Sequence, residues 1–178
     1  EFRKTWQLST YDQLVAHVSG GAIWSYGNSS AAPWSEQFYV GGANSIRAFT
    51  VRSIGPGSYQ AHRNTTSYLD QTGDIKLLCN LEYRPRLFGN LYGALFLDAG
   101  NVWTMHKDEN RPNGSLRAKN LLKEMAVGTG IGLRYNLDFF VLRVDWGIGL
   151  HVPYGNGFYN VPNFKDSQSL HLAIGYPF

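Results

Sequence analysis

The chain has 178 residues and a net charge of +3, and charged residues are only 16% of it, which gives no case for a nucleic-acid partner. Aromatic residues make up 15% and mean hydropathy is −0.27, yet no stretch approaches the roughly 20 apolar residues of a membrane-spanning helix. The single cysteine, Cys79, excludes an intrachain disulfide.

Alternating apolar and polar residues predict six strands, with the tail of a seventh at the start of the chain. A period of two indicates strand, because successive side chains point to opposite sides of a sheet. Most of the runs have about ten residues or more, which exceeds the usual five or six of soluble domains and suits a tilted strand crossing a bilayer. In chain order, the predicted strands are 2–8, 13–26, 74–84, 90–103, 124–135, 139–152 and 169–178.

Two of these strands show the alternation most clearly. One face of 74–84 carries Ile75, Leu77, Cys79, Leu81 and Tyr83, and the other carries Lys76, Leu78, Asn80, Glu82 and Arg84. One face of 139–152 carries Phe140, Leu142, Val144, Trp146, Ile148 and Leu150. An apolar face toward lipid and a polar face toward a lumen predict an all-β protein, an antiparallel transmembrane β-barrel.

The connections between the predicted strands alternate in length. The turns 9–12, 85–89 and 136–138 are short, whereas the loops 27–73, 104–123 and 153–168 are long and rich in Gly, Pro, Asn and charge. This sidedness is typical of bacterial outer-membrane barrels, whose short turns are periplasmic. It predicts that the chain ends at the periplasmic rim.

The number of strands is too small for closure. A closed barrel in lipid needs at least about eight, because an open edge leaves backbone groups unpaired. We therefore expect residues 1–178 to be the C-terminal part of a barrel from a longer secreted precursor. The other reading is that several chains contribute strands.

One long loop carries a specific motif. Residues 36–49 read Glu-Gln-Phe-Tyr-Val-Gly-Gly-Ala-Asn-Ser-Ile-Arg-Ala-Phe, and Gly-Pro-Gly follows at 55–57. The stretch resembles the sixth extracellular loop of the BamA/TamA superfamily, the bacterial surface antigen family, with an aromatic, Gly-Gly, Asn-Ser and hydrophobic-Arg-Gly-aromatic pattern. Ala48 stands where that pattern has glycine. The positions of this chain that correspond to the motif are Gly41, Gly42, Ile46, Arg47, Ala48 and Phe49.

Two further segments match the same family in order. Residues 80–85 resemble its strand motif with a glutamate before an aromatic, and residues 96–103 resemble its Phe-x-Asp-x-Gly-x-Val-Trp segment. The resemblance covers nearly the whole chain and is nearest to the TamA-like branch. It implies the last six or seven strands of a sixteen-stranded barrel, with loop 27–73 folded into the lumen.

The alternation of side chains along each strand places Glu82 and Asp98 on lumen-facing positions of neighbouring strands. Two inward carboxylates and an arginine on a long loop suit a bidentate, charge-assisted cluster. The resemblance implies this role for Arg47, which would lock the loop onto Glu82 and Asp98. The alternative is that these are pore-lining charges without a shared partner.

Other candidate sites are weaker. Arg143 and Asp145 share one face of their strand. Their positions predict an ordinary lumenal ion pair. The spacing of His17, His151 and His171 suits no metal site, and no serine has evident partner spacing to His171 for phospholipase chemistry. Inward glycines in 128–132 leave room for something bulky, most simply the folded-back loop. We expect no catalytic residue, metal or cofactor.

The closing strand 169–178 ends on an aromatic residue, with Pro177 just before it. Alternation predicts a shared lipid face for Leu170, Leu172, Ile174, Tyr176 and Phe178. The resemblance implies that this ending is an assembly-recognition signal and one side of a weak barrel seam. Proline fits an edge because it cannot donate to a strand ladder.

The expected function follows from the resemblance. It implies a non-enzymatic bacterial outer-membrane assembly factor that inserts or translocates unfolded outer-membrane or secreted client proteins at the seam. Outer-membrane lipids and a periplasmic or inner-membrane assembly protein are its other expected partners. Two alternatives stay open, namely a two-partner secretion pore and the barrel anchor of a fusion with an N-terminal lipase.

Overall fold

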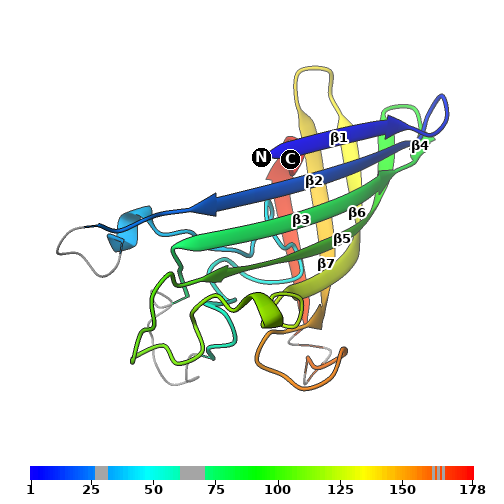
Figure 1. Cartoon of the computed structure of the whole chain (residues 1–178). Helices are drawn as coiled ribbons and strands as arrows, with labels where there is room; N and C mark the ends of the chain where they lie inside the picture. The colour runs from blue at the N-terminus through cyan, green and yellow to red at the C-terminus, as the bar shows by residue number, and fades with distance from the viewer. Residues whose placement is uncertain (27–31, 61–70, 162, 164, 166) are drawn as a thin grey trace.

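The protein is a single antiparallel sheet that curls around one of its own loops (Figure 1). The computed structural model describes residues 1–26, 32–60, 71–161, 163, 165 and 167–178. Short 3-10 turns occur at Trp34–Glu36 and Ala118–Asn120. The strands are β1 (Phe2–Gln7), β2 (Gln13–Ala22), β3 (Ile75–Arg84), β4 (Arg86–Phe88), β5 (Leu91–Trp103), β6 (Ala126–Asn136), β7 (Val141–His151) and β8 (Gln168–Ile174).

Each long strand pairs with the next along the chain, in the order β1-β2-β3-β5-β6-β7-β8, and β4 pairs with β5. This is the meander that alternating short and long connections predict. The described strands leave one edge of β1 and one edge of β8 without a strand partner, so the sheet is open. The number of strands in a closed barrel stays a prediction.

All seven predicted strands are present, and the errors lie at their ends. β2 stops at Ala22 rather than at residue 26, and β7 begins at Val141 rather than at 139. A short strand, β4, occupies most of the predicted turn 85–89, because the β3–β5 hairpin continues past Pro85 through a register shift. β8 stops at Ile174 because Gly175 has φ +88°, a conformation that turns the chain out of the strand.

The two faces of the sheet follow the predicted alternation. Leu81, Leu95 and Leu97 on one face are 41–54% exposed, whereas Glu82 and Asp98 on the other are fully buried. Glu82 lies opposite Phe96, and Asn80 lies opposite Asp98. The two carboxylates are therefore diagonal neighbours on the concave face.

The concave face is covered by the connection between β2 and β3, which Figure 1 shows in cyan inside the curl. Residues 27–31 and 61–70 of the predicted loop 27–73 lie outside the described residues. The described part packs an apolar layer onto β3 and β5 that includes Val40, Ile46 and Ile54. No helix in the described part of the chain is both long and apolar enough to cross a membrane.

Candidate functional site

The backbone of residues 41–50 forms a tight turn that presents Arg47 to the sheet. Gly42 donates its N–H to the Phe49 carbonyl at 2.8 Å, and Phe49 donates to the Ile46 carbonyl at 3.1 Å. Gly41 has φ +96°, and a Cβ there would lie 2.1 Å from the Thr50 carbonyl oxygen. Only glycine fits such a position, which explains the Gly-Gly of the motif.

Arg47 binds both predicted carboxylates and is itself fully buried. Its Nε and Nη2 donate to the two oxygens of Asp98, each at 2.8 Å, and its backbone N–H donates to Asp98 Oδ2 at 3.0 Å. Nη1 donates to Glu82 Oε2. The guanidinium carbon lies 3.7 Å from the centre of the Phe96 ring. The structure therefore brings Arg47, Glu82 and Asp98 together with the bidentate geometry that the sequence predicted.

The cluster extends to arginines that the sequence reasoning did not include. Arg84 Nε donates to Glu82 Oε1 at 2.7 Å, and Arg134 Nη2 donates to Glu82 Oε2 at 3.2 Å. Arg134 Nη1 also lies 2.6 Å from Asp145 Oδ1. The alternation of inward and outward residues could have indicated Arg134, because Arg134 continues the inward positions of β6 that begin with the glycines of 128–132. Glu82 thus lies among three guanidinium groups.

Arg143 forms the predicted lumenal ion pair with Asp145 and also contacts the loop. Its Nη1 lies 3.6 Å from Asp145 Oδ2, whereas Arg134 is 1.0 Å closer to the same carboxylate group. Arg143 also donates to the Ala43 carbonyl at 2.9 Å and to Asn44 Oδ1 at 2.5 Å. It is therefore a second arginine contact between sheet and loop, made from β7. The spacing of residues in the sequence could not show that Arg143 contacts Ala43 and Asn44, which follow the Gly-Gly of the loop motif.

Two polar side chains complete the attachment of the loop. Asn80 Nδ2 donates to Asp98 Oδ1 at 2.8 Å and to the Ser45 carbonyl at 2.9 Å. His171 Nε2 lies 2.9 Å from the Arg47 carbonyl, so the closing strand β8 also contacts the loop. We name Arg47, Glu82 and Asp98 the loop lock. Through its neighbours, the lock joins the loop to β3, β5, β6, β7 and β8.

His171 also corrects the prediction that no serine is placed to partner it. Ser169 Oγ lies 2.9 Å from His171 Nε2, because residues two apart on a strand share a face. The same nitrogen is within hydrogen-bonding distance of the Arg47 carbonyl. When that nitrogen donates to the carbonyl, it cannot accept the serine proton. The geometry fits a structural contact better than an activated nucleophile.

Strand glycines provide the room in which the loop turn sits. A Cβ on Gly128 would lie 2.2 Å from the Ala48 Cβ, and a Cβ on Gly147 would lie 2.6 Å from the Arg47 carbonyl oxygen. Of the glycines predicted to accommodate the loop, Gly128 does so, whereas a Cβ on Gly130 or Gly132 would meet the side chain of Phe96 or Asp145 on the sheet instead. Ala48 is not among the residues with positive φ, and its methyl group occupies space that Gly128 leaves. The alanine is therefore compatible with this turn.

The end of the chain departs from the predicted lipid-facing alternation. Leu170, Leu172 and Ile174 are 71–78% exposed on the outward face, as predicted. Beyond Gly175 the chain turns, and the Phe178 ring stacks on His17 with centroids 5.0 Å apart. Phe178 also lies 5.7 Å from the guanidinium of Arg47. In this structure Phe178 therefore lies on the inner side rather than on the predicted lipid face, because Gly175 interrupts the strand period.

The sheet is curled and antiparallel with an apolar outer face, and a loop arginine binds two carboxylates on its inner face. These features define a class of barrel with an inserted loop. Comparison with known protein families agrees, since the Omp85 superfamily domain matches residues 1–178. The chain belongs to the Omp85 superfamily. The assignment to its TamA-like branch stays a prediction.

Several characterised proteins are similar to this chain. It is 32% identical over 141 residues to the human sorting and assembly machinery component 50 homolog, covering 74% of this chain and 29% of that protein. It is 30% identical over 107 residues to the outer membrane protein assembly factor BamA of Neisseria meningitidis serogroup B, covering 56% of this chain and 13% of that protein. The chain thus matches about a quarter of the length of sorting and assembly machinery component 50 homologs from Xenopus.

Among solved structures, the sheet is similar to BamA from Haemophilus ducreyi lacking POTRA domains 1–3. The TM-score is 0.64 at 16% sequence identity, and the match covers 97% of this chain and 34% of that structure. At this identity the likeness shows the fold. That residues 1–178 are the C-terminal part of a sixteen-stranded barrel stays a prediction.

Proposed function

We propose that this chain is the C-terminal barrel part of an outer-membrane protein assembly factor, placed in an outer membrane. Membership of the Omp85 superfamily and the similarity to proteins named as assembly factors support this function. The observation that carries the proposal is the loop lock, because the fully buried Arg47 holds a polar loop within the sheet.

The filled interior favours a route for client proteins along the barrel wall. The described loop packs against β3 and β5, and inward glycines of β6 and β7 receive its turn. At the same time, β8 presents an edge without a strand partner in the described sheet. An exposed edge can pair with an incoming strand by β-augmentation. We propose that client strands pair at this edge, which is one side of the barrel seam.

The loop lock would couple the loop to that edge. His171 on β8 contacts the Arg47 carbonyl, and Arg47 is bonded to carboxylates on β3 and β5. The position of the closing strand therefore depends on a loop held by the opposite wall of the curl. No energy source or cofactor is required in this mechanism, because folding of the client strand supplies the driving force.

A disulfide across the seam tests the proposed route in the full-length protein. One cysteine is placed on β8 and its partner on the first barrel strand, and assembly of a client barrel is measured in proteoliposomes with and without reductant. We expect assembly to be lost when the seam is locked and to return on reduction. The matched control joins β7 to β8 with Val144→Cys and Leu172→Cys, which lie opposite each other away from the seam.

The same experiment separates the two alternative functions. A two-partner secretion pore exports its client through the lumen, so a locked seam should leave export intact. A barrel anchor of an N-terminal lipase should keep lipase activity in every variant and show no assembly. If the locked protein assembles its client as well as the reduced protein, the proposed seam mechanism is wrong.

A further inference from the structure

The connection between β5 and β6 carries an excess of positive charge. Residues 104–123 contain five basic residues and two acidic ones, and the chain as a whole has a net charge of +3. Four of the basic residues are exposed. We name them the basic loop surface, and they are Lys107, Arg117, Lys119 and Lys123.

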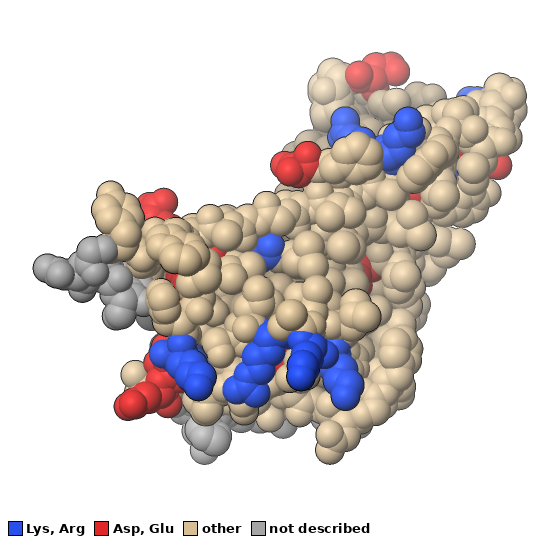
Figure 2. Space-filling model, viewed as in Figure 1, with Lys and Arg blue, Asp and Glu red and all other residues tan. Residues whose placement is uncertain are grey.

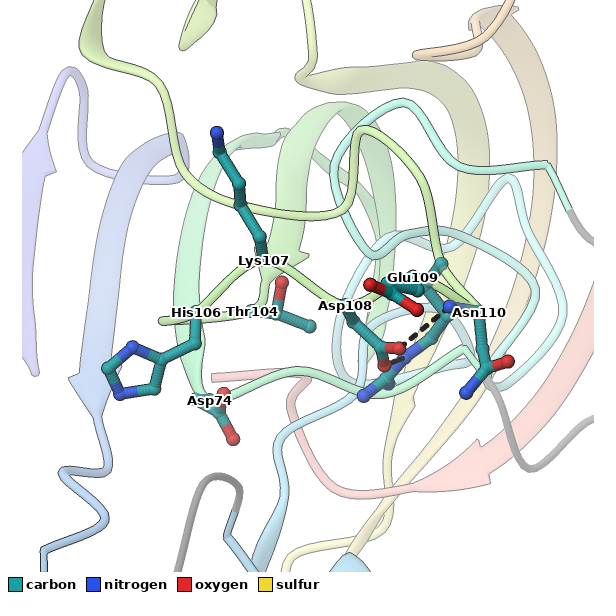
Figure 3. Close-up of a pocket in the computed structure, with 8 residues that line it drawn as sticks. Asp74, Thr104, His106, Lys107, Asp108, Glu109 and Asn110 are labelled. Carbon is teal, nitrogen blue, oxygen red and sulfur yellow. Dashed lines mark hydrogen bonds and ion pairs between the residues drawn. The ribbon is translucent and has the colours of Figure 1, made fainter.

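The acidic residues of this connection leave the basic loop surface largely uncompensated. Arg111 donates to Asp108 at 2.7 Å, and this hydrogen bond lowers the pKa of the Asp108 carboxyl, so the carboxylate is paired within the loop. Figure 3 shows Lys107 pointing away from Asp108 and Glu109. Within the described residues, none of the four side chains of the surface lies in an ion pair.

Exposed leucines lie among these charges. Leu122 is 86% exposed and Leu116 is 40% exposed, although both are large apolar side chains in a polar loop. A segment with basic side chains and exposed leucines is the composition of an interfacial membrane-binding segment. A cleft whose lining includes Ser58, Asn120 and Lys123 opens beside it.

The position of the surface matches the boundary of a membrane. Figure 2 shows a row of Lys and Arg side chains along the lower edge of the molecule, below a face that is mostly uncharged. That face includes outward leucines of β5, with Leu95 54% and Leu97 46% exposed. The strands above suit hydrocarbon, so the row at their end lies at the level of lipid headgroups.

We propose that the basic loop surface binds phosphate groups of lipid headgroups at the long-loop side of the membrane, while Leu116 and Leu122 enter the interface. A soluble acidic protein or a nucleic acid would provide the negative charge but no apolar layer for the two leucines. This inference depends on the sheet facing lipid and is independent of the seam mechanism. Each basic side chain near an anionic lipid surface is expected to contribute about fivefold in affinity.

The test measures lipid binding to the detergent-solubilised full-length protein by native mass spectrometry. The probes are a bisphosphorylated lipid A and, as a zwitterionic comparison, phosphatidylcholine. The variant combines Arg117→Gln, Lys119→Gln and Lys123→Gln. The matched control combines Arg3→Gln, Lys4→Gln and Lys165→Gln, which removes the same number of exposed basic side chains elsewhere. Heat-modifiable gel mobility confirms that both variants fold.

We expect the variant to bind lipid A about a hundredfold more weakly, with the matched control and phosphatidylcholine binding unchanged. Replacing Leu122 with Ser should weaken binding of both lipids by a smaller factor, because it removes apolar contact without removing charge. Equal lipid A binding in the variant and the parent overturns the proposal. Displacement of lipid A by millimolar inorganic phosphate also overturns it, since the site would then bind free anions rather than a lipid.

Discussion

The concave and convex faces of this sheet differ in what they bury. On the concave face Arg47, Glu82 and Asp98 are fully buried, whereas on the convex face Leu170, Leu172 and Ile174 are 71–78% exposed. A soluble protein shows the opposite distribution, because burying charge away from water is unfavourable whereas burying apolar surface is favourable. The difference indicates that the solvent outside the sheet is apolar. It also shows that the interior is held by charge pairing rather than by an apolar core alone.

The largest expected effect comes from removing the central arginine. Arg47→Ala leaves Glu82 and Asp98 buried without their main partner, which should lower the free energy of unfolding by about 3–5 kcal/mol. Urea unfolding of the full-length protein measures it. Arg52→Ala is the control on the same loop, because its guanidinium only lies over the Trp34 ring at 4.6 Å and the Tyr39 ring at 4.7 Å. Its loss should cost about 0.5–1 kcal/mol.

A mutant cycle tests whether these residues act as one unit. Glu82→Gln combined with Asp98→Asn should destabilise the parent strongly but add less once Arg47 is already alanine. Fully additive losses would contradict a shared cluster and favour independent pore-lining charges.

The second-largest expected effect on stability comes from a charge placed on the convex face. Val144 lies opposite Leu133 and Leu172, which are both exposed on the same face. Val144→Arg should cost about 2–4 kcal/mol in the membrane, whereas Val144→Leu should be nearly neutral. Cysteines placed at 142, 144 and 148 provide the direct measurement. Ready labelling of these cysteines by a charged, membrane-impermeant reagent would refute the lipid-facing assignment.

A third, smaller effect tests how closely the loop meets the sheet. Gly128→Ala should cost about 1–3 kcal/mol, because the new Cβ would lie 2.2 Å from the Ala48 Cβ. Adding Ala48→Gly should recover most of the loss. Gly147→Ala is the contrast, since its Cβ would meet the Arg47 carbonyl oxygen at 2.6 Å and Ala48→Gly cannot relieve a backbone contact. Melting temperatures of the four variants measure this, and an absence of rescue would contradict the docking of the turn.

The sequence predicted the strands from local alternation, whereas the locking role of Arg47 was implied by the resemblance to the BamA/TamA superfamily. Alternation assigned Glu82 and Asp98 to the inner face. The extension to Arg134 depends on how far its long side chain reaches from β6 past β5 to Glu82 on β3, and periodicity does not contain this information. The contact of Arg143 with Ala43 joins residues 100 positions apart and needed the fold.

The end of the chain shows where periodicity fails. Alternation over 169–178 assumes an unbroken strand, but Gly175 has φ +88° and the strand ends at Ile174. After that point a period of two carries no information about direction. Side-chain placement then depends on tertiary contacts, here the ring of His17.

The smallest expected effect decides to which face Phe178 belongs. Its ring stacks on His17 at 5.0 Å with an interplanar angle of 5°, so a cycle of Phe178→Leu and His17→Gln should show a coupling energy of about 0.5–1.5 kcal/mol. Tyr176→Leu with His17→Gln is the control, because Tyr176 lies over Arg84 at 4.4 Å instead. That pair should be additive. If the Phe178 pair is also additive within about 0.5 kcal/mol, the terminal aromatic faces lipid in the full-length barrel, as its alternation predicted. Coupling would instead place it beside the loop lock, where it limits how far the closing strand can move from the opposite wall.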